Sequence, residues 1–140
     1  MKKIVFVCLG NICRSPMAEF VMKSITDQHY IESRATSSWE HGNPIHAGTQ
    51  TIFKNHQIPY DRHKTSQQIS ASDFEVFDYI IAMDDKNLRD LRGMAPAQFR
   101  DKIVPFASQP IPDPWYTGDF NQTYQLITQG CRDWQEKLSK

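Results

Sequence analysis

Apolar residues along this chain follow two different periods, which indicates strands alternating with helices. Short and nearly continuous apolar runs occur at 4–7 and 77–83, and such runs are typical of buried parallel strands. A third run at 103–106 contains Pro105, which favours an edge strand. The short polar segment 32–38 is the remaining strand candidate, leading into a loop. The pattern therefore predicts a sheet of four strands.

Between these runs, apolar positions recur at helical spacing. This spacing predicts helices from Pro16 to about Gln28, over 44–56, over 87–92 and over 120–138. Ser15 followed by Pro16 fits an N-cap and a first helical residue. The proline-rich segment 107–119 is expected to be loop. Alternating strands and helices favour an α/β fold, with a doubly wound, mainly parallel four-stranded sheet and helices on both faces.

Length, charge and cysteine content narrow the class of protein. A chain of 140 residues favours one domain spanning 1–140. The 16 basic and 16 acidic residues cancel, so we expect no general affinity for nucleic acid or membranes. Met1-Lys2-Lys3 leads directly into the first strand, so we expect no secretory leader. Three cysteines do not make a disulfide framework, and a cytoplasmic location is expected.

The segment 8–15, Cys-Leu-Gly-Asn-Ile-Cys-Arg-Ser, follows the first strand where open α/β sheets bind ligands. Gly10 allows close backbone approach, and Asn11 tolerates the left-handed conformation. Backbone N–H groups before a helix bind anions, and Arg14 can contact two oxygens of one anion. The positive electrostatic potential of these N–H groups and of Arg14 is expected to favour ionisation of Cys8. A thiolate beneath a phosphoryl group is an in-line nucleophile. If Cys8 were instead an inert strand residue, Arg14 would lack a partner.

The segment 7–16 resembles the active-site loop of the low-molecular-weight protein tyrosine phosphatases. Three further stretches resemble motifs of that family in the same order, and together they cover nearly the whole chain. They are Ser33 with Thr36-Ser37, the segment 77–91, and the Asp-Pro-aromatic-aromatic sequence at 113–116. The resemblance implies a flavodoxin-like fold. It also implies hydrolysis of phosphotyrosine through a cysteinyl-phosphate intermediate, with no cofactor.

The resemblance assigns roles to individual residues. Cys8 would be the nucleophile, Arg14 the anion-binding group and Asp113 the general acid. Ser15 would assist departure of the sulfur, and Asn11 would be held by Ser33 and His63, beside the loop residues Leu9, Gly10 and Ile12. Taken from the residues alone, Asp113 before proline is more often a turn residue, and His63 is more often an exposed side chain.

The resemblance also implies a redox role for Cys13 and aromatic walls for the pocket. Cys13 would trap oxidised Cys8 as a disulfide, although it could also be a packing residue. Trp39, Trp115 and Tyr116 would stack on a phosphotyrosine ring. The family commonly has tyrosine where this chain has the two tryptophans, so the peptide preference stays open. Cys131 on the last helix is expected in the core.

The expected partners are phosphotyrosine proteins, with phosphate, vanadate or other oxyanions as inhibitors. We expect no metal site, because the five histidines lack a paired ligand motif. The protein is expected to be a monomer or a weak dimer.

Three alternatives remain. A protein arginine phosphatase of the same family has threonine at the position of Ile12, an arsenate reductase requires further downstream cysteines, and a phosphocarrier would hold phosphate on cysteine without turnover.

Overall fold

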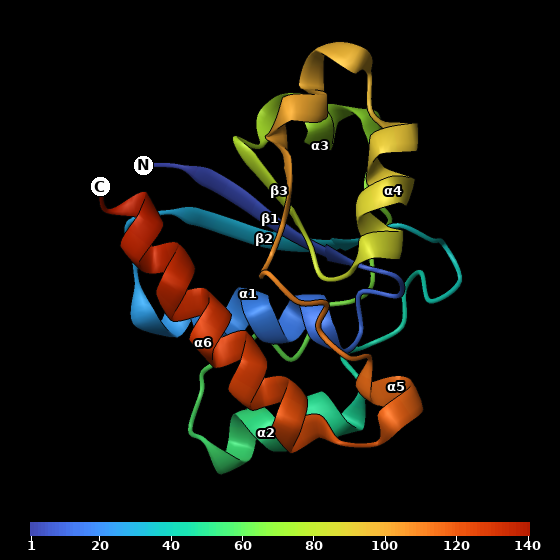
Figure 1. The fold of residues 1–140 in the computed structure, drawn as a ribbon. Helices are drawn as coiled ribbons and strands as arrows, with labels where there is room; N and C mark the ends of the chain where they lie inside the picture. Colours follow the sequence, from blue (N-terminus) through green and yellow to red (C-terminus); the bar gives the residue numbers. More distant parts are fainter.

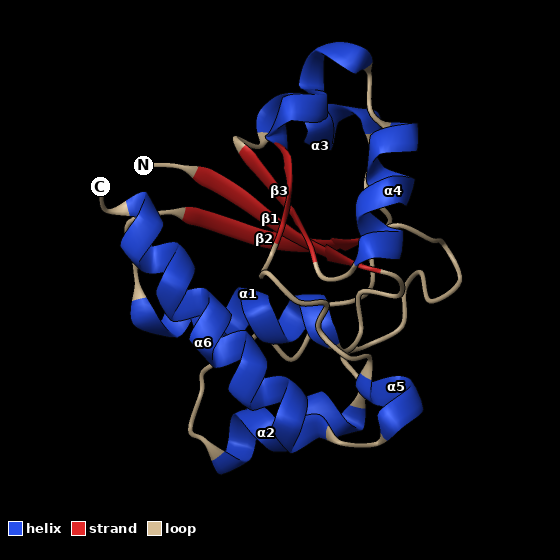
Figure 2. Cartoon of the chain, viewed as in Figure 1, coloured by secondary structure: helices blue, strands red, loops and turns tan.

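The computed structural model describes residues 1–140 and contains one parallel sheet of four strands. The strands are β1 (Lys3–Cys8), β2 (Tyr30–Ala35), β3 (Tyr79–Ala82) and β4 (Ile103–Pro105). Their order across the sheet is β2-β1-β3-β4, and all three neighbouring pairs are parallel (Figure 2). The chain thus runs outward from β1 to β2 and then returns to β3 and β4, which confirms the predicted doubly wound sheet.

The helices cover both faces of the sheet (Figure 1). One layer contains α1 (Arg14–Ile25), α2 (Ala47–Asn55) and α6 (Phe120–Leu138). The other contains α3 (Ala71–Val76), α4 (Asp85–Met94) and the 3₁₀ helix η1 (Ala97–Lys102). The short α5 (Pro114–Thr117) lies beside the start of α6. None of the helices combines the length and the hydropathy that a membrane-spanning helix needs.

Alternate residues of β1 pack into the two layers, because successive strand side chains point to opposite faces. Ile4 and Phe6 join the core beneath α1 and α6, and Val5 and Val7 join the smaller core beneath α3 and α4. All four side chains are fully buried. Cys8 is therefore the last residue of a buried central strand. It lies at the carboxyl ends of the strands, where ligands bind in such folds.

The boundaries of several predicted elements were wrong, and two of these differences affect the site. Helix α1 begins at Arg14 rather than at Pro16, and its N-cap is Cys13, so Ser15 is inside the helix. Strand β2 spans Tyr30–Ala35 rather than residues 32–38. Its polar residues Ser33 and Arg34 are buried because carboxylates accept their hydrogen bonds, and this burial hides the strand from a search for apolar runs.

Three short elements were not predicted: α3, η1 and α5. The predicted loop at 107–119 in fact contains α5, which Asp113 caps. The helix expected from Pro44 begins instead at Ala47, because Pro44 forms a bridge with Thr65 and His46 caps the helix.

Candidate active site

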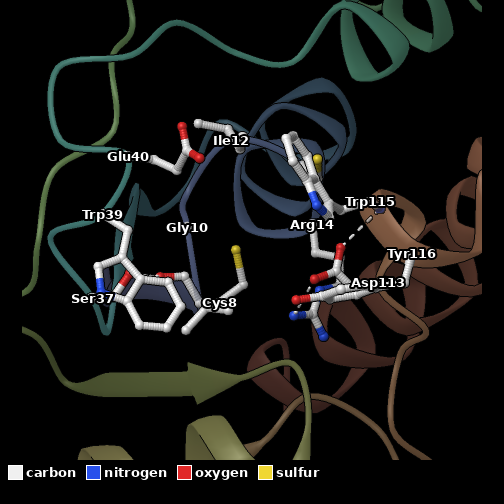
Figure 3. A pocket seen from close by; sticks show the side chains of 12 residues that line it. Cys8, Gly10, Ile12, Arg14, Ser37, Trp39, Glu40, Asp113, Trp115 and Tyr116 are labelled. Carbon is white, nitrogen blue, oxygen red and sulfur yellow. Dashed lines mark hydrogen bonds and ion pairs between the residues drawn. The ribbon is translucent and has the colours of Figure 1, made fainter.

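A cavity of about 220 Å³ opens at the carboxyl end of β1, where residues 8–14 connect that strand to α1 (Figure 3). We call residues 8–14 the phosphate loop and residues 111–117 the acid loop. The cavity brings together residues from these two loops and from the segment after β2. Its walls are Cys8, Leu9, Gly10, Ile12, Cys13, Arg14, Ser37, Trp39, Glu40, Asp113, Trp115 and Tyr116.

Asn11 fixes the shape of the phosphate loop. Its φ of 55° is left-handed, a conformation that asparagine tolerates better than most residues. Its backbone N–H donates to Cys8 Sγ at 3.3 Å, and its side-chain amide donates to Ser15 Oγ at 2.8 Å and to Ser33 Oγ at 2.9 Å. The amide oxygen accepts from the backbone N–H of Gln67 at 3.1 Å. These four hydrogen bonds of Asn11 hold the phosphate loop in one conformation.

Ser15 lies beside the Cys8 sulfur because α1 begins at Arg14. Its Oγ accepts a hydrogen bond from the Cys8 thiol at 3.1 Å, and its hydroxyl donates to the carbonyl oxygen of Arg34 at 3.3 Å. Since Cys13 is the N-cap, the Ser15 side chain does not cap the helix. The hydroxyl is therefore available to interact with the sulfur.

Arg14 is buried, with 3% of its surface exposed, and three oxygens accept its hydrogen bonds. Nη1 donates to Asp84 Oδ2 at 2.7 Å and to the Ile111 carbonyl at 3.0 Å, and Nη2 donates to Asp113 Oδ2 at 3.4 Å. Burial alone would lower the pKa of Arg14, but the negative charges of Cys8, Asp84 and Asp113 outweigh it and raise that pKa. The guanidinium is therefore a fixed cation beside the cavity.

Asp113 begins α5 and faces Arg14. Its Oδ1 accepts a hydrogen bond from the backbone N–H of Trp115 at 3.0 Å, and its Oδ2 accepts from Arg14. The side chain is 21% exposed, so the carboxyl group lies at the cavity wall rather than in the core. Helix capping and proximity to the phosphate loop together fix its position (Figure 3).

Asp84 belongs to the site but was not among the residues predicted for it. One carboxylate oxygen accepts from the Asn87 N–H at 2.7 Å and begins α4, while the other accepts from Arg14. Its place directly after the apolar run 77–83 was the available signal, because residues at the carboxyl ends of parallel strands lie at one edge of the sheet.

A buried ionic cluster lies behind Asn11, and the sequence did not reveal it. Glu19 is 2% exposed, accepts from the Ser33 hydroxyl at 2.5 Å, and pairs with Lys23 Nζ at 2.7 Å and Lys64 Nζ at 3.1 Å. Lys64 also donates to the Ser33 carbonyl at 3.1 Å. A charged residue within the otherwise buried face of the predicted first helix was the only signal for this cluster.

His63 does not contact Asn11, so the expectation for this residue was wrong. Its side chain is exposed, and its backbone N–H donates to Asp61 Oδ1 at 2.8 Å. The turn that begins at Asp61 directs the neighbouring Lys64 inward instead. The Gln67 backbone takes the place that His63 was expected to fill beside Asn11.

Two further cysteines accompany Cys8, and all three are free thiols. Cys13 lines the cavity, and burial together with the charge of Cys8 raises its pKa far above the ordinary value of 9.0. Cys131 lies in the core between α6 and α1, where burial raises its pKa in the same direction. Both thiols are therefore protonated at neutral pH.

Aromatic side chains stand on both sides of the cavity mouth (Figure 3). Trp39 lies on one side, and Trp115 and Tyr116 lie on the other. They are 78%, 56% and 76% exposed. Side chains of this kind bury apolar surface when a ring enters between them.

The described residues include no group of three or more His, Cys, Asp or Glu side chains placed to bind a metal ion.

Comparison with known proteins agrees with this geometry. The family model described as low molecular weight phosphotyrosine protein phosphatase matches residues 3–140. The low molecular weight protein-tyrosine-phosphatase YfkJ of Bacillus subtilis is 38% identical, over 100% of this chain and 97% of that protein.

Solved structures resemble the whole fold. The low molecular weight protein tyrosine phosphatase SP-PTP from Streptococcus pyogenes shares 60% identity with a TM-score of 0.97, covering 99% of this chain and 93% of that one. The drosophila arginine phosphatase DARP shares 33% identity with a TM-score of 0.90, covering 100% and 99%. On this evidence the chain belongs to the low molecular weight phosphotyrosine protein phosphatase family.

Proposed function

We propose that this protein hydrolyses phosphotyrosine in proteins, and small aryl phosphates, through a cysteinyl-phosphate intermediate, and that residues 1–140 act as one phosphatase domain. One observation carries the proposal: the Cys8 sulfur lies at the base of the phosphate loop, between the Ser15 hydroxyl and the Asn11 N–H. The buried Arg14 cation lines the same cavity. This arrangement suits a tetrahedral dianion above a nucleophilic sulfur.

In the first step, the Cys8 thiolate attacks phosphorus opposite the ester oxygen, and the S–P bond forms as the P–O bond breaks. Arg14 and the backbone N–H groups of the phosphate loop stabilise the equatorial oxygens. Asp113 gives its proton to the departing phenolate oxygen. Its attachment to α5 keeps the carboxyl group at the cavity wall, where that oxygen leaves.

In the second step, water attacks the phosphocysteine, and inorganic phosphate and the thiolate are the products. Asp113, now ionised, accepts a proton from the water. The Ser15 hydroxyl donates to the sulfur as its negative charge returns, because it already lies 3.1 Å from Sγ. A hydrogen bond to the charged form stabilises the leaving thiolate.

The walls of the cavity favour an aryl phosphate over a shorter phosphoserine. Trp39, Trp115 and Tyr116 can enclose a phenyl ring once the phosphoryl group occupies the phosphate loop. The substrates we propose are phosphotyrosine proteins of the cytoplasm. Phosphate and vanadate would occupy the same loop as inhibitors.

Replacement of Cys8 by serine tests the mechanism. We expect Cys8→Ser to lose turnover of 4-nitrophenyl phosphate below detection, because serine has no comparable thiolate, while calorimetry still shows binding of inorganic phosphate. Cys13→Ser, a change of the same kind in the same cavity, should keep turnover and serves as the control. Turnover by Cys8→Ser would remove Cys8 from the mechanism.

Two other functions are separated by the choice of substrate and by the time course. A phosphocarrier would release one equivalent of nitrophenol and stop, whereas the proposed enzyme continues without added metal. An arginine phosphatase, as DARP is named, would prefer phosphoarginine. Ile12 opposes that preference here, because its aliphatic side chain lines the cavity and offers no hydrogen bond to a guanidinium.

A further inference from the structure

We propose that His46 is a positioning residue that aligns the acid loop with the phosphate loop, and this inference rests on the proposed function of Asp113 as general acid. His46 precedes α2 and has no place in the mechanism described above. It contacts both loops that form the cavity. The link runs from the phosphate loop through the imidazole to Trp115, and from Trp115 to Asp113.

The backbone of His46 is attached to the phosphate loop. Its N–H donates to the carbonyl oxygen of Ile12 at 2.9 Å. Its side chain caps α2, because Nδ1 accepts a hydrogen bond from the Gly48 N–H at 2.9 Å. This bond fixes the ring orientation and requires an unprotonated Nδ1. The imidazole is therefore held at a set angle relative to the phosphate loop.

The ring of His46 contacts two aromatic side chains that follow the acid residue. It stacks on Phe120 with centroids 5.1 Å apart and an interplanar angle of 22°. It meets Trp115 edge to face, at 5.6 Å and 79°. Gly48 makes the stack possible, since a Cβ atom there would lie 2.5 Å from the Phe120 ring. Gly48 and His46 together therefore form the surface against which Phe120 packs, and the His46 ring also contacts Trp115.

Trp115 transmits this position to the acid residue. Its backbone N–H donates to Asp113 Oδ1 at 3.0 Å, so the carboxyl group and the tryptophan form one unit at the start of α5. Helix α5 has only four residues, too few to be stable without tertiary contacts. More than half of Trp115 is exposed, at 56%, so its indole packs against the protein on one side only, while Arg14 contacts the carboxyl group of Asp113. The His46 ring is part of that support.

Two substitutions separate the ring of His46 from its cap. His46→Asn keeps a side-chain acceptor for the Gly48 N–H, because asparagine is a good N-cap, but it removes the ring. His46→Phe keeps an aromatic ring and removes the acceptor. Phe120→Leu, which removes the aromatic partner of His46, provides a second variant in which the ring stack is lost.

The measurement is kcat/KM for aryl phosphates that range from dinitrophenyl to phenyl phosphate, because a misplaced acid matters most for poor leaving groups. We expect His46→Asn to lower kcat/KM about tenfold for phenyl phosphate and less than twofold for dinitrophenyl phosphate. Phe120→Leu should show the same pattern. His46→Phe should keep the wild-type dependence on the leaving group and lower only Tm.

His56→Asn is the matched control. His56 lies at the other end of α2, and its ring stacks on Tyr124 of α6 at 4.0 Å, but it contacts neither loop. We expect no change in the leaving-group dependence for this variant. In an Asp113→Ala background, His46→Asn should cause no further loss, because both changes remove the same proton transfer.

An equal loss for all leaving groups in His46→Asn, or no loss, would overturn the inference. The same leaving-group effect in His46→Phe would also overturn it, because the cap rather than the ring would then be responsible. Asp113→Ala distinguishes failure of the acid assignment from failure of the positioning role. If the loss of kcat/KM in Asp113→Ala is the same for all leaving groups, the acid assignment fails. If that loss is larger for poor leaving groups but the loss in His46→Asn is not, only the role of His46 fails.

Discussion

Asp84 and Asp113 each use one carboxylate oxygen to begin a helix and the other to contact Arg14. A carboxylate at a helix N-terminus is stabilised by the partial positive charge there. Together with Cys8, the same two groups supply the negative charge that stabilises the buried guanidinium. Two ordinary helix caps thereby orient the cation of the site.

Asp113 can be tested without loss of its cap. In Asp113→Asn the side chain still accepts from the Trp115 N–H but has no acidic proton. We expect kcat/KM for phenyl phosphate to fall by about 10²–10⁴, the usual contribution of a general acid, and to fall much less for dinitrophenyl phosphate. Steady-state rates across the aryl phosphate series measure this, and a uniform loss would argue against the acid role.

Cys13 provides a second test at this scale. Peroxide should convert Cys8 to a sulfenic acid, and Cys13 should then displace water to form a disulfide. Burial is the main cause of the raised pKa of Cys13, and oxidation of Cys8 removes the second cause, the charge of Cys8, which favours this attack. We expect dithiothreitol to restore activity to the oxidised wild type and not to Cys13→Ser. Mass spectrometry that finds only sulfonic acid at Cys8 in the wild type would contradict this.

Local spacing explains which site residues the sequence could predict. Cys8 and Arg14 belong to one short loop, so their arrangement follows from the strand and helix on either side. Glu19 and Lys64 are far apart in the sequence and come together only in the folded chain. No short sequence pattern therefore predicts their contact. His63 was expected beside Asn11 on the resemblance alone, and the turn that begins at Asp61 directs Lys64 inward instead.

At the scale of elements, the strands with continuous apolar runs were predicted and the strand with buried polar residues was misplaced. β1 and β3 are recognisable because both of their faces are covered. In β2, Arg34 is buried beside Asp73, so its burial depends on a partner far along the chain. The helices α3 and α5 have six and four residues, and caps rather than hydrophobic periodicity define them.

Two glycines in helices should respond oppositely to alanine. A Cβ at Gly130 of α6 would overlap the Phe106 ring, whereas a Cβ at Gly93 of α4 would meet nothing within 4 Å. We expect Gly130→Ala to lower the free energy of unfolding by about 1–3 kcal/mol through overpacking. Gly93→Ala should raise it by up to about 1 kcal/mol through helix propensity. Urea unfolding measures both, and a stabilised Gly130→Ala would show that α6 is less closely packed.

At the scale of the whole molecule, the two faces of the sheet have unequal cores. The cluster beneath α1 and α6 contains 20 buried residues and the opposite cluster contains 10, so the larger one carries most of the apolar burial. Cys131 lies in the larger cluster. The zero net charge shows that anion affinity here is a property of one loop and not of the overall field.

The buried thiols make stability depend on alkaline pH. Their folded pKa is raised, so the folded state keeps protons that the unfolded state loses above about pH 9. The contribution of these two thiols to the free energy of unfolding should therefore be constant below that pH and fall by about 1.4 kcal/mol per pH unit per thiol above it. We expect Cys131→Ala to have the shallower slope in urea unfolding at about pH 7.5–10.5, a range that spans the ordinary thiol pKa. Ile127→Val, a core change in the same helix, should leave the slope unchanged, and an unaltered slope in Cys131→Ala would contradict the prediction.

The contrast between the cavity and the core also has a practical consequence. Cys131 is 0% exposed and protonated, while Cys8 and Cys13 line an opening that small molecules can enter. A compact alkylating reagent should therefore modify folded chains only at the opening, beginning with the proposed nucleophile Cys8. The stoichiometry of label per chain would then count the competent molecules in a preparation, with no need for a turnover assay.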